Sequence, residues 1–203
     1  AVSHLPDLPY DVQLFQTNIV NAAAAPGGQI MVFSGLYDAR DGLAKDDDEL
    51  AAVLAHEIAH VTCRHTTEAL TREMPVNLLL MGASIYAEAK GKEDLAMWLG
   101  AGFLVYQGLL LPKYSRGDEA EADAVGLLYM AKAGYDPRAA LRIWKRAREK
   151  EGDPGFLAML SSHPSNKDRY RALEKRLPAA MAEYARVKGG YPPDYQPPAG
   201  AAR

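Results

Sequence analysis

Two histidines four residues apart, His56 and His60, enclose a glutamate in the segment Ala55-His-Glu-Ile-Ala-His-Val61. On a helix, residues at positions i and i+4 lie on one face, so both imidazoles can reach a single metal ion. Glu57 follows His56 directly and lies at the edge of the same face, where a general base can take a proton from a metal-activated water. The spacing therefore predicts a zinc site that carries its own base.

The residues around this motif favour a helix. Four acidic residues, from Asp46 to Glu49, precede it and suit the positive end of a helix. The apolar residues that follow recur at helical spacing and predict a buried face: Leu50, Val53, Leu54, Ile58 and Val61. We expect this main helix to run from about Asp48 to Arg72 and to end before Pro75.

A catalytic zinc needs a third protein ligand besides the two histidines. One class of zinc peptidase supplies it within the pattern H-E-x-x-H-x-x-G-x-x-H, but here Cys63 and Thr66 occupy the glycine and last histidine positions. Cys63 would lie about 10 Å along the helix axis from His56, too far to share its ion. His65 would face the opposite side of the helix. We therefore interpret Cys63 and His65 as packing or surface residues.

The remaining route to a third ligand is a glutamate on a second helix. Glu119 is a candidate because Asp123 follows it at i+4, on the same face of a predicted helix. Asp123 could then accept the N–H of a ligating histidine. Spacing alone does not separate Glu119 from Glu88, Glu93 and Glu121, nor from an ordinary solvated acidic face.

Length and composition limit the remaining possibilities. With 203 residues, the chain is long enough for one domain with a substantial core. A net charge of -3 and the lack of any basic block argue against nucleic acid as a partner. The single cysteine excludes an internal disulfide. Because the chain begins at Ala1 rather than Met, we expect a processed or trimmed form.

Two apolar segments, residues 75–87 and 95–111, raise the question of a membrane. The first is too short to span a bilayer, and the second has 17 residues, contains Gln107 and falls below the usual spanning length. We interpret both as buried helices or as helices that lie under the active site. A shallow, peripheral membrane contact by these segments stays open as an alternative.

The segment before the main helix predicts a small antiparallel sheet. Residues 12–20 and 29–33 are rich in residues that favour strands, and the Pro-Gly-Gly sequence at 26–28 indicates a turn between them. Ser34 would cap a short helix through Tyr37. The sequence therefore predicts a mostly α protein with a small antiparallel sheet near its start, an α+β fold.

Further helices are expected after the main one. Their predicted ranges are about 76–89, 93–111, 116–133, 137–150 and 166–187. Ser115 with Asp118 forms a weak capping box, Asp136-Pro137 is a cap with a first-turn proline, and Ser165 with Asp168 opens the last helix. From residue 189 onward the chain is rich in Pro and Gly and should be a disordered tail. We therefore expect one domain over residues 1–187 and a tail over residues 188–203.

Four ordered motifs resemble one peptidase family. The run Ser115-Arg-Gly-Asp-Glu-Ala-Glu-Ala-Asp-Ala-Val-Gly126 resembles the S-R-x-x-E-x-x-A-D-x-x-G sequence of the HtpX/BepA-like, CAAX-prenyl-protease type of gluzincin zinc metallopeptidase. The stretch from Asn21 to Gly28, followed by Gly35-Leu36, resembles that family's N-A-x-x-x-P-G-G and G-L. His163-Pro164 with Arg169 is similar to its H-P-x-x-x-x-R, and the H-E-x-x-H motif lies between these segments.

The resemblance implies a zincin-like peptidase domain with the H-E-x-x-H helix at its centre. One zinc ion per chain would be held by His56, His60 and Glu119, with a fourth position for water. Glu57 would act as the general base and later protonate the leaving amine. Asp123 would support a ligating histidine from behind. The implied activity is zinc-dependent endopeptidase action on extended or unfolded polypeptides.

The resemblance also implies roles away from the zinc ligands. The residues that match His163 and Arg169 in the family are placed to stabilise the oxyanion, and we expect His163 to alternate between contact with the metal and donation to that oxyanion. The strand with residues Asn21, Ala22, Ala23 and Ala24 would bind the substrate backbone as an added strand. The likeness is closest to soluble peptidases of cell-envelope quality control, which implies a bacterial periplasm.

Three other readings are weighed against the endopeptidase. A deformylase would need a cysteine ligand before His56, and none is present. An aminopeptidase would need a glutamate that binds the free amine, and the sequence does not identify one. A zinc-binding, chaperone-like module with little hydrolysis is the alternative of a different class, although Glu57 has no purpose in a purely structural site. The natural substrate and the oligomeric state are not given by the sequence.

Overall fold

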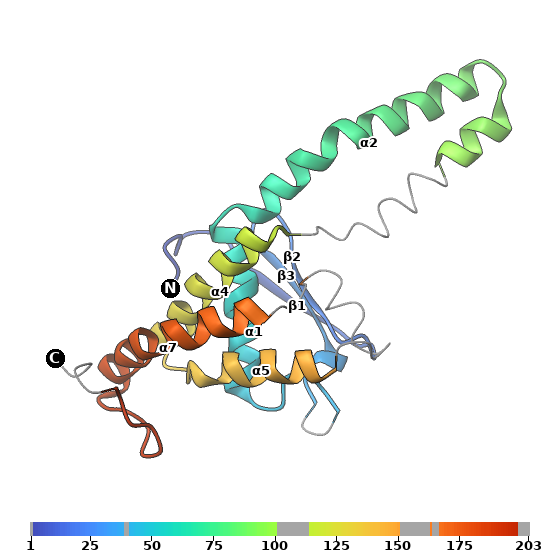
Figure 1. The fold of residues 1–203 in the computed structure, drawn as a ribbon. Coiled ribbons are helices and arrows are strands. Elements are labelled where there is room, and N and C mark those ends of the chain that lie inside the picture. Colours follow the sequence, from blue (N-terminus) through green and yellow to red (C-terminus); the bar gives the residue numbers. More distant parts are fainter. Residues whose placement is uncertain (1, 39–40, 101–113, 151–162, 164–166, 199–203) are drawn as a thin grey trace. The chain divides into compact units, whose positions relative to one another are not determined.

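The computed structural model describes residues 2–38, 41–100, 114–150, 163 and 167–198. The chain divides into two compact units, one of residues 1–65 and 114–203 and the other of residues 66–113. Unit one contains the sheet, the H-E-x-x-H helix and the helices that follow residue 114 (Figure 1). The fold is mostly helical with a small sheet, which confirms the fold class expected from the sequence.

The sheet has three strands in the order β1-β3-β2, with β1 at Asp11–Phe15, β2 at Ala22–Ala24 and β3 at Gln29–Phe33. β2 and β3 pair antiparallel across the Pro-Gly-Gly turn, where Gly27 and Gly28 have φ values of 91° and 98°. β1 pairs parallel with β3, so the sheet is mixed, and the expectation of a wholly antiparallel sheet was wrong. The difference arises because β1 lies at the far edge of β3 instead of forming a hairpin with its neighbour in sequence.

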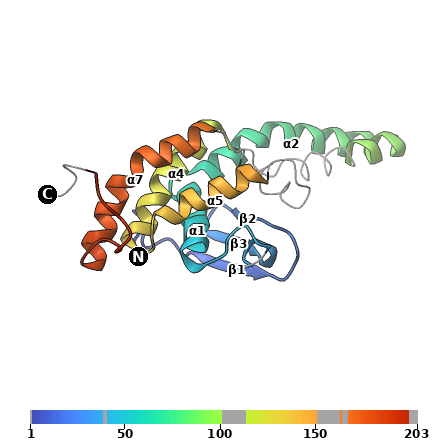
Figure 2. The same cartoon turned by 60° about the horizontal axis from the view of Figure 1, so that its bottom comes forward.

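Helix α1 (Asp47–Thr62) lies between the sheet and the remaining helices of unit one. It packs against β2 and β3 on one side and against α4 (Arg116–Lys132) and α5 (Arg138–Glu149) on the other (Figure 2). α7 (Lys167–Lys188) covers α4 and α5, and η1 (Ser34–Leu36) follows the sheet. Side chains of α1, including His56 and His60, are therefore buried between the sheet and the other helices.

Caps set the starts of the two helices that carry the acidic and histidine motifs. The Asp46 carboxylate accepts a hydrogen bond of 2.8 Å from the Glu49 backbone N–H at the start of α1. Ser115 and Asp118 form the predicted capping box at the start of α4. Further along, α5 also agrees with its predicted range, whereas the predicted cap of α7 at Ser165 lies outside the described residues.

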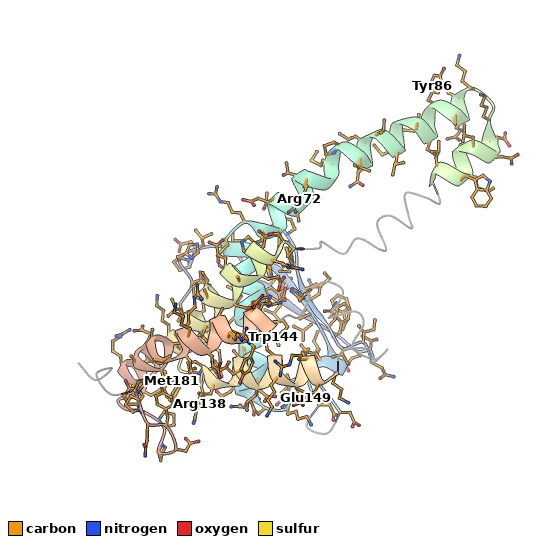
Figure 3. All side chains as sticks on the ribbon, in the orientation of Figure 1. Arg72, Tyr86, Arg138, Trp144, Glu149 and Met181 are labelled. Atoms are coloured by element: carbon orange, nitrogen blue, oxygen red, sulfur yellow. The ribbon has the colours of Figure 1, made fainter. Side chains whose placement is uncertain are left out.

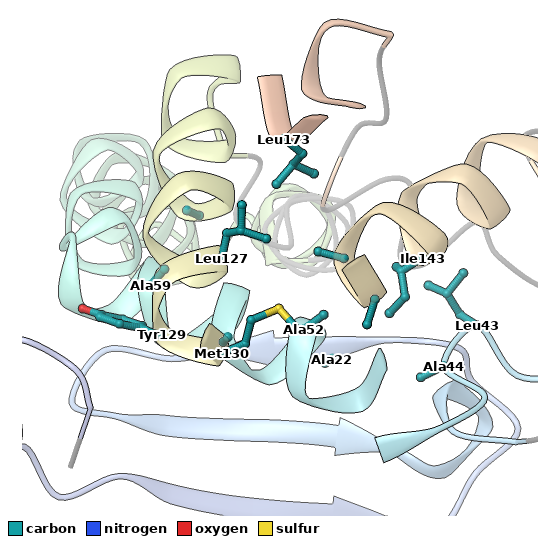
Figure 4. Packing of buried hydrophobic residues seen from close by; sticks show 14 of the residues in the cluster. Ala22, Leu43, Ala44, Ala52, Ala59, Leu127, Tyr129, Met130, Ile143 and Leu173 are labelled. Carbon is teal, nitrogen blue, oxygen red and sulfur yellow. The ribbon is translucent and has the colours of Figure 1, made fainter. Parts of the chain in front are cut away.

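Small residues let α1 and α4 approach closely. The core shown in Figure 4 combines alanines of α1, such as Ala52 and Ala59, with Leu127 and Met130 of α4. At Gly126 an added Cβ would lie only 3.0 Å from the Ala55 carbonyl oxygen and the His56 backbone nitrogen. The backbones of the two helices are therefore in near contact beside the first histidine.

The predicted single helix from Asp48 to Arg72 is two helices in the structure. α1 ends at Thr62, Arg64 adopts a left-handed conformation with φ of 67°, and α2 (His65–Ala89) begins directly afterwards. Pro75 does not end a helix, because α2 continues through it with the loss of the hydrogen bond that its missing N–H would donate. The expected start near Asp48 agrees with the structure, whereas the expected end at Arg72, before Pro75, was wrong.

Unit two consists of the rest of α2 and a helical stretch over residues 93–100, and the remainder of the expected helix 93–111 lies outside the described residues. Many of its large apolar side chains are exposed, among them Leu79, Tyr86 and Trp98, and Tyr86 is labelled in Figure 3. Among the described residues, no helix is both long and apolar enough to cross a membrane.

Part of the tail that was expected to be disordered has defined contacts. Residues 189–198 follow α7, and both oxygens of Asp194 accept hydrogen bonds of 2.9 and 3.0 Å from the Arg138 guanidinium of α5. Arg138 also binds Asp136, which precedes Pro137, the N-cap residue of this helix. Residues 199–203 lie outside the described part of the chain.

Candidate active site

The helical spacing of the H-E-x-x-H motif brings both histidines to one point. His56 and His60 are 8% and 0% exposed, and their Nε2 atoms lie 3.0 Å apart. Glu57 is 2% exposed, and its Oε2 atom has no hydrogen-bond partner among the described residues. A buried carboxylate oxygen without a partner is costly, which is typical of a group kept for chemistry.

Helix α4 brings a carboxylate to the same point. The oxygens of Glu119 lie 3.4 Å from His56 Nε2 and 3.3 Å from His60 Nε2. The other acidic candidates are placed differently: the Glu121 side chain is 60% exposed and contacts His65, while Glu88 and Glu93 are exposed on unit two. Tertiary structure thus separates Glu119 from alternatives that spacing could not distinguish.

His163 joins this cluster from a position far along the chain. Its Nδ1 lies 3.0 Å from Glu119 Oε1 and 3.3 Å from His56 Nε2, and its Nε2 lies 3.3 Å from Glu57 Oε1. With 4% exposure the ring is as buried as the histidines of α1. It therefore contacts two of the candidate ligands and the candidate base.

The four side chains fit a metal ion. One ligand atom from each of His56, His60, Glu119 and His163 lies within 4.8 Å of the others. Tetrahedral zinc with bonds of about 2.0–2.1 Å separates its ligand atoms by roughly 3.3 Å, and the closest contacts here are 3.0–3.4 Å. Imidazole nitrogens and a carboxylate oxygen are also the donors of catalytic zinc sites. The set can hold zinc with or without His163.

A buried ion pair supports His56 from behind. Its Nδ1 lies 3.1 Å from an oxygen of Asp123, which in turn accepts two hydrogen bonds of 2.7 and 2.8 Å from Arg169. The third nitrogen of the Arg169 guanidinium lies 2.5 Å from Glu119 Oε2, and Trp144 covers its face at 3.7 Å. In Figure 3 the labelled Trp144 projects from α5 toward α7, which carries Arg169. This arrangement connects both ligand helices with α7.

His60 has a different partner. Its Nδ1 lies 3.0 Å from Nδ1 of His65, whose Nε2 lies 3.3 Å from Glu121. The ring of Tyr114 stacks on His60 at 3.7 Å between centroids. His65 is 3% exposed. It was expected to be a packing or surface residue, but its ring also contacts His60, a candidate ligand.

No sequence signal indicates Trp144 or Tyr114, because apolar and aromatic residues of a helix or loop normally belong to the core. His65 could have been recognised only if the helix break at Arg64 had been known. An unbroken helix turns residues 60 and 65 about 140° apart, at 100° per residue. The break is what allows the two rings to meet.

The pKa values of these side chains reflect this crowding. Burial opposes the charged form of His56, but hydrogen bonds to Asp123 and Glu119 outweigh it and raise its pKa to about 10. Burial lowers the pKa of His60 well below 6.5. The pKa of Glu119 is lowered because hydrogen bonds from the three histidines outweigh its burial. Burial raises the pKa of Glu57, which makes its carboxylate a stronger base than an exposed one.

The edge of the sheet borders the base. β2, with Ala22, Ala23 and Ala24, is the last strand of the sheet, and Asn21 before it is 3% exposed. A backbone hydrogen bond from Ala24 reaches Glu57. A small apolar pocket lies beside Glu57 and His56 and is lined by side chains that include Leu36, Leu43, Val53, Ile143 and Leu173. The candidate base therefore lies between a strand edge and an apolar pocket.

Comparisons with known proteins agree with this geometry. The family model "Peptidase family M48" matches residues 1–177. The mitochondrial metalloendopeptidase OMA1 of Schizosaccharomyces pombe is 41% identical over 186 residues, which are 90% of this chain and 51% of that protein. OMA1 of Arabidopsis thaliana is 35% identical over 192 residues, 94% of this chain and 36% of that protein.

A bacterial protein also matches. The beta-barrel assembly-enhancing protease of Yersinia pestis is 31% identical over 135 residues, 64% of this chain and 26% of that protein. The chain therefore spans about half the length, or less, of these curated relatives. The family match covers both ligand helices and reaches Arg169, and it confirms the resemblance drawn from the four motifs. With most of its length matched, the chain belongs to peptidase family M48.

Proposed function

We propose that this chain is a zinc-dependent metalloendopeptidase that hydrolyses peptide bonds in extended or unfolded proteins. The observation that carries the proposal is the convergence of His56, His60 and Glu119, with buried Glu57 beside them. Three protein ligands leave a position for water, which distinguishes catalytic from structural zinc sites. Family membership and the named metalloendopeptidases among the relatives support the same reading.

The chemistry follows from the residues of the chain. A zinc ion held by His56, His60 and Glu119 supplies Lewis acidity for a peptide carbonyl and a water molecule. Glu57, whose pKa is raised by burial, accepts a proton from the attacking water. It then passes this proton to the leaving amine nitrogen. Asp123 keeps His56 in the tautomer that ligates through Nε2.

His163 and Arg169 have different roles in this proposal. His163 reaches both Glu57 and Glu119, which suits a residue that contacts the metal at rest and donates to the oxyanion during the reaction. The guanidinium of Arg169 already binds Asp123 and Glu119 with its three nitrogens. We therefore assign Arg169 to positioning these two carboxylates, and the direct oxyanion contact implied by the resemblance is left to His163.

Substrate would bind along β2. An edge strand offers unpaired backbone groups to an extended peptide, so Asn21, Ala22, Ala23 and Ala24 can take it up as an additional strand. This mode recognises backbone, which suits unfolded polypeptides of varied sequence. The neighbouring apolar pocket would take an apolar side chain next to the scissile bond.

One experiment tests the proposal: the zinc content and the hydrolysis of an unfolded protein are compared for the wild type, Glu57→Gln and Glu174→Gln. We expect one zinc per chain in all three. Glu57→Gln should lose at least a hundredfold in turnover, because an amide cannot act as the base. Glu174→Gln, which changes an exposed carboxylate of α7, is the control. Unchanged turnover in Glu57→Gln would leave the zinc-binding, chaperone-like module as the better function.

Location and membrane contact belong to the proposal as well. Relatives are named both as mitochondrial and as a bacterial protease, so quality control in a cell envelope, including the periplasm, rests on the resemblance alone. The exposed apolar side chains of unit two, among them Leu79 and Trp98, support a shallow contact with a membrane surface. Flotation of the chain with phospholipid vesicles, compared with Leu79→Ser/Trp98→Ser, would test this contact.

A further inference from the structure

A second group of metal-ligating side chains lies outside the site described above. Cys63, His65 and Glu121 each offer one ligand atom, and these atoms lie within 4.8 Å of one another. His65 Nε2 and Glu121 Oε2 are 3.3 Å apart. The group combines two adjoining helix ends with α4, so it depends on tertiary structure and is absent from any local sequence pattern.

The helix break creates this group. Cys63 and His65 are two residues apart, and on a continuous helix their side chains would point about 200° away from each other. The left-handed conformation of Arg64, with φ of 67°, redirects the chain between them. Both side chains then face Glu121 on α4. A non-glycine residue with positive φ is uncommon and is worth a functional explanation.

The donors and their exposure suit a cation that enters from solvent. A thiolate, an imidazole nitrogen and a carboxylate are ligands of zinc, and the thiolate favours soft ions over magnesium or calcium. His65 is 3% exposed, Cys63 is half-buried and the Glu121 side chain is 60% exposed. Burial and the nearby Glu121 raise the pKa of the Cys63 thiol, so it stays protonated until a cation displaces the proton.

We propose that Cys63, His65 and Glu121 form a second zinc site, weaker than the catalytic one, through which excess zinc inhibits the enzyme. The inhibitory part rests on the proposed function, because it acts through His60. Three protein ligands at a partly exposed position bind zinc less tightly than a buried set. The site is therefore empty at low zinc and fills only when zinc is in excess.

The hydrogen bond between His60 and His65 couples the two sites. When His60 ligates through Nε2, its hydrogen is on Nδ1 and is donated to Nδ1 of His65, 3.0 Å away. His65 then carries its own hydrogen on Nε2, toward Glu121. A zinc ion bound to His65 Nε2 would displace that hydrogen to solvent, and the imidazole would take up a proton from solvent on Nδ1, where it would face the hydrogen of His60. Two donors then oppose each other, and His60 loses the partner that orients it.

The test is a titration of the full chain with Zn²⁺ beyond one equivalent, in which calorimetry measures the binding. We expect a second, weaker binding event that Cys63→Ser weakens at least tenfold, whereas Glu174→Gln, an exposed carboxylate of α7, leaves it unchanged. Titration with Co²⁺ should give a thiolate-to-metal charge-transfer band that is absent in Cys63→Ser. The band should persist in Glu119→Ala, in which the catalytic site is disrupted.

The activity arm separates this inference from the proposed function. The Zn²⁺ concentration that inhibits hydrolysis should be at least tenfold lower for the wild type than for Cys63→Ser. At one equivalent of zinc, both proteins should have equal activity. A second binding event or a cobalt band that is unchanged in Cys63→Ser overturns the site. Binding without any difference in inhibition overturns the coupling. If the wild type shows no hydrolysis at one equivalent of zinc but keeps the cobalt band, only the proposed function is contradicted.

Discussion

The two histidines of α1 are supported in opposite ways. His56 contacts the carboxylate of Asp123, which is 6% exposed and is fixed by the buried guanidinium of Arg169. His60 instead contacts the imidazole ring of a second histidine, His65. One support is a charged, buried pair that spans three helices. The other is a hydrogen bond whose outer end reaches solvent through an exposed glutamate.

This difference indicates that the contacts behind His56 and those behind His60 have different roles. The buried pair holds α1, α4 and α7 together and also contacts Glu119, so it supports structure and ligands at once. The pair of histidine rings supports one candidate ligand, and only Glu121, the outer partner of His65, is exposed to solvent. We therefore expect mutations on the Asp123 side to affect both stability and metal binding, and mutations on the His65 side to affect metal binding alone.

The largest effect is expected for Asp123→Ala. The substitution leaves the buried Arg169 without its main partner, and breaking such a pair costs about 3–5 kcal/mol in the free energy of unfolding. Zinc affinity should fall about ten- to a hundredfold, because His56 loses its acceptor. Urea unfolding and competition with a chelator measure the two effects. A loss below about 1 kcal/mol, equal to that of the exposed control Asp168→Ala, would contradict the structural role.

A second buried carboxylate provides a comparison away from the metal. Both oxygens of Glu49 accept hydrogen bonds from Arg146, at 2.7 and 3.1 Å, and Arg142 adds a third. Burial alone would raise the pKa of Glu49, but these donors lower it. A carboxyl group with a lowered folded pKa stabilises the protein above its unfolded pKa, and this contribution is lost as the pH falls through the folded value.

Glu49→Gln should therefore reduce the free energy of unfolding by about 1–3 kcal/mol at pH 7, without a change in zinc affinity. The difference from the wild type should shrink when both are unfolded in urea below pH 4. If the difference were the same at pH 7 and pH 3, it would arise from the packing of the side chain and not from the charge of the Glu49 carboxylate.

His65→Ala is expected to have a smaller effect that is confined to the metal. A buried donor that loses a neutral acceptor costs about 1–3 kcal/mol, which corresponds to a five- to hundredfold loss in zinc affinity at most. The free energy of unfolding of the metal-free protein should change little compared with Asp123→Ala. His65→Asn, which can still accept the N–H of His60, should restore most of the affinity. Equal affinities of the two variants would argue against the hydrogen bond.

Glu121→Gln should show the smallest effect, a change of about twofold or less in zinc affinity at one equivalent. Exposed ion pairs contribute only about 0–1 kcal/mol, and the amide can still accept from His65. The chelator competition used for His65 serves here too. A loss as large as that of Asp123→Ala would mean that the two supports are equivalent.

The sequence predicted the part of the site that lies within one helix. The relation between His56, Glu57 and His60 follows from helical geometry alone, and the range of α4 follows from its capping box. The choice of Glu119 over Glu121 could not follow from spacing, because it depends on the rotation of α4 against α1. The motif resemblance pointed to Glu119 by analogy, without the distances that explain it.

For the main helix, a single backbone feature was responsible for the wrong prediction. Apolar periodicity continues past Thr62, so nothing in the pattern indicates that Arg64 adopts a left-handed conformation. The break hid the contact of His65 with His60. Likewise, strand propensity identified the segments of β1 and β3, but it does not determine whether two strands pair parallel or antiparallel.

Gly126 has a consequence for the kind of ion that the site accepts. It is seven residues after Glu119 on α4, and an added Cβ would lie 3.0 Å from the backbone of α1 at Ala55 and His56. A methyl group there would act as a wedge between the helix with two ligands and the helix with the third. Zinc and calcium bonds to oxygen differ by only about 0.3–0.5 Å in length, a displacement that such a wedge can produce. We therefore expect Gly126, which is not one of the proposed ligands, to influence the ionic radius that the proposed site fits.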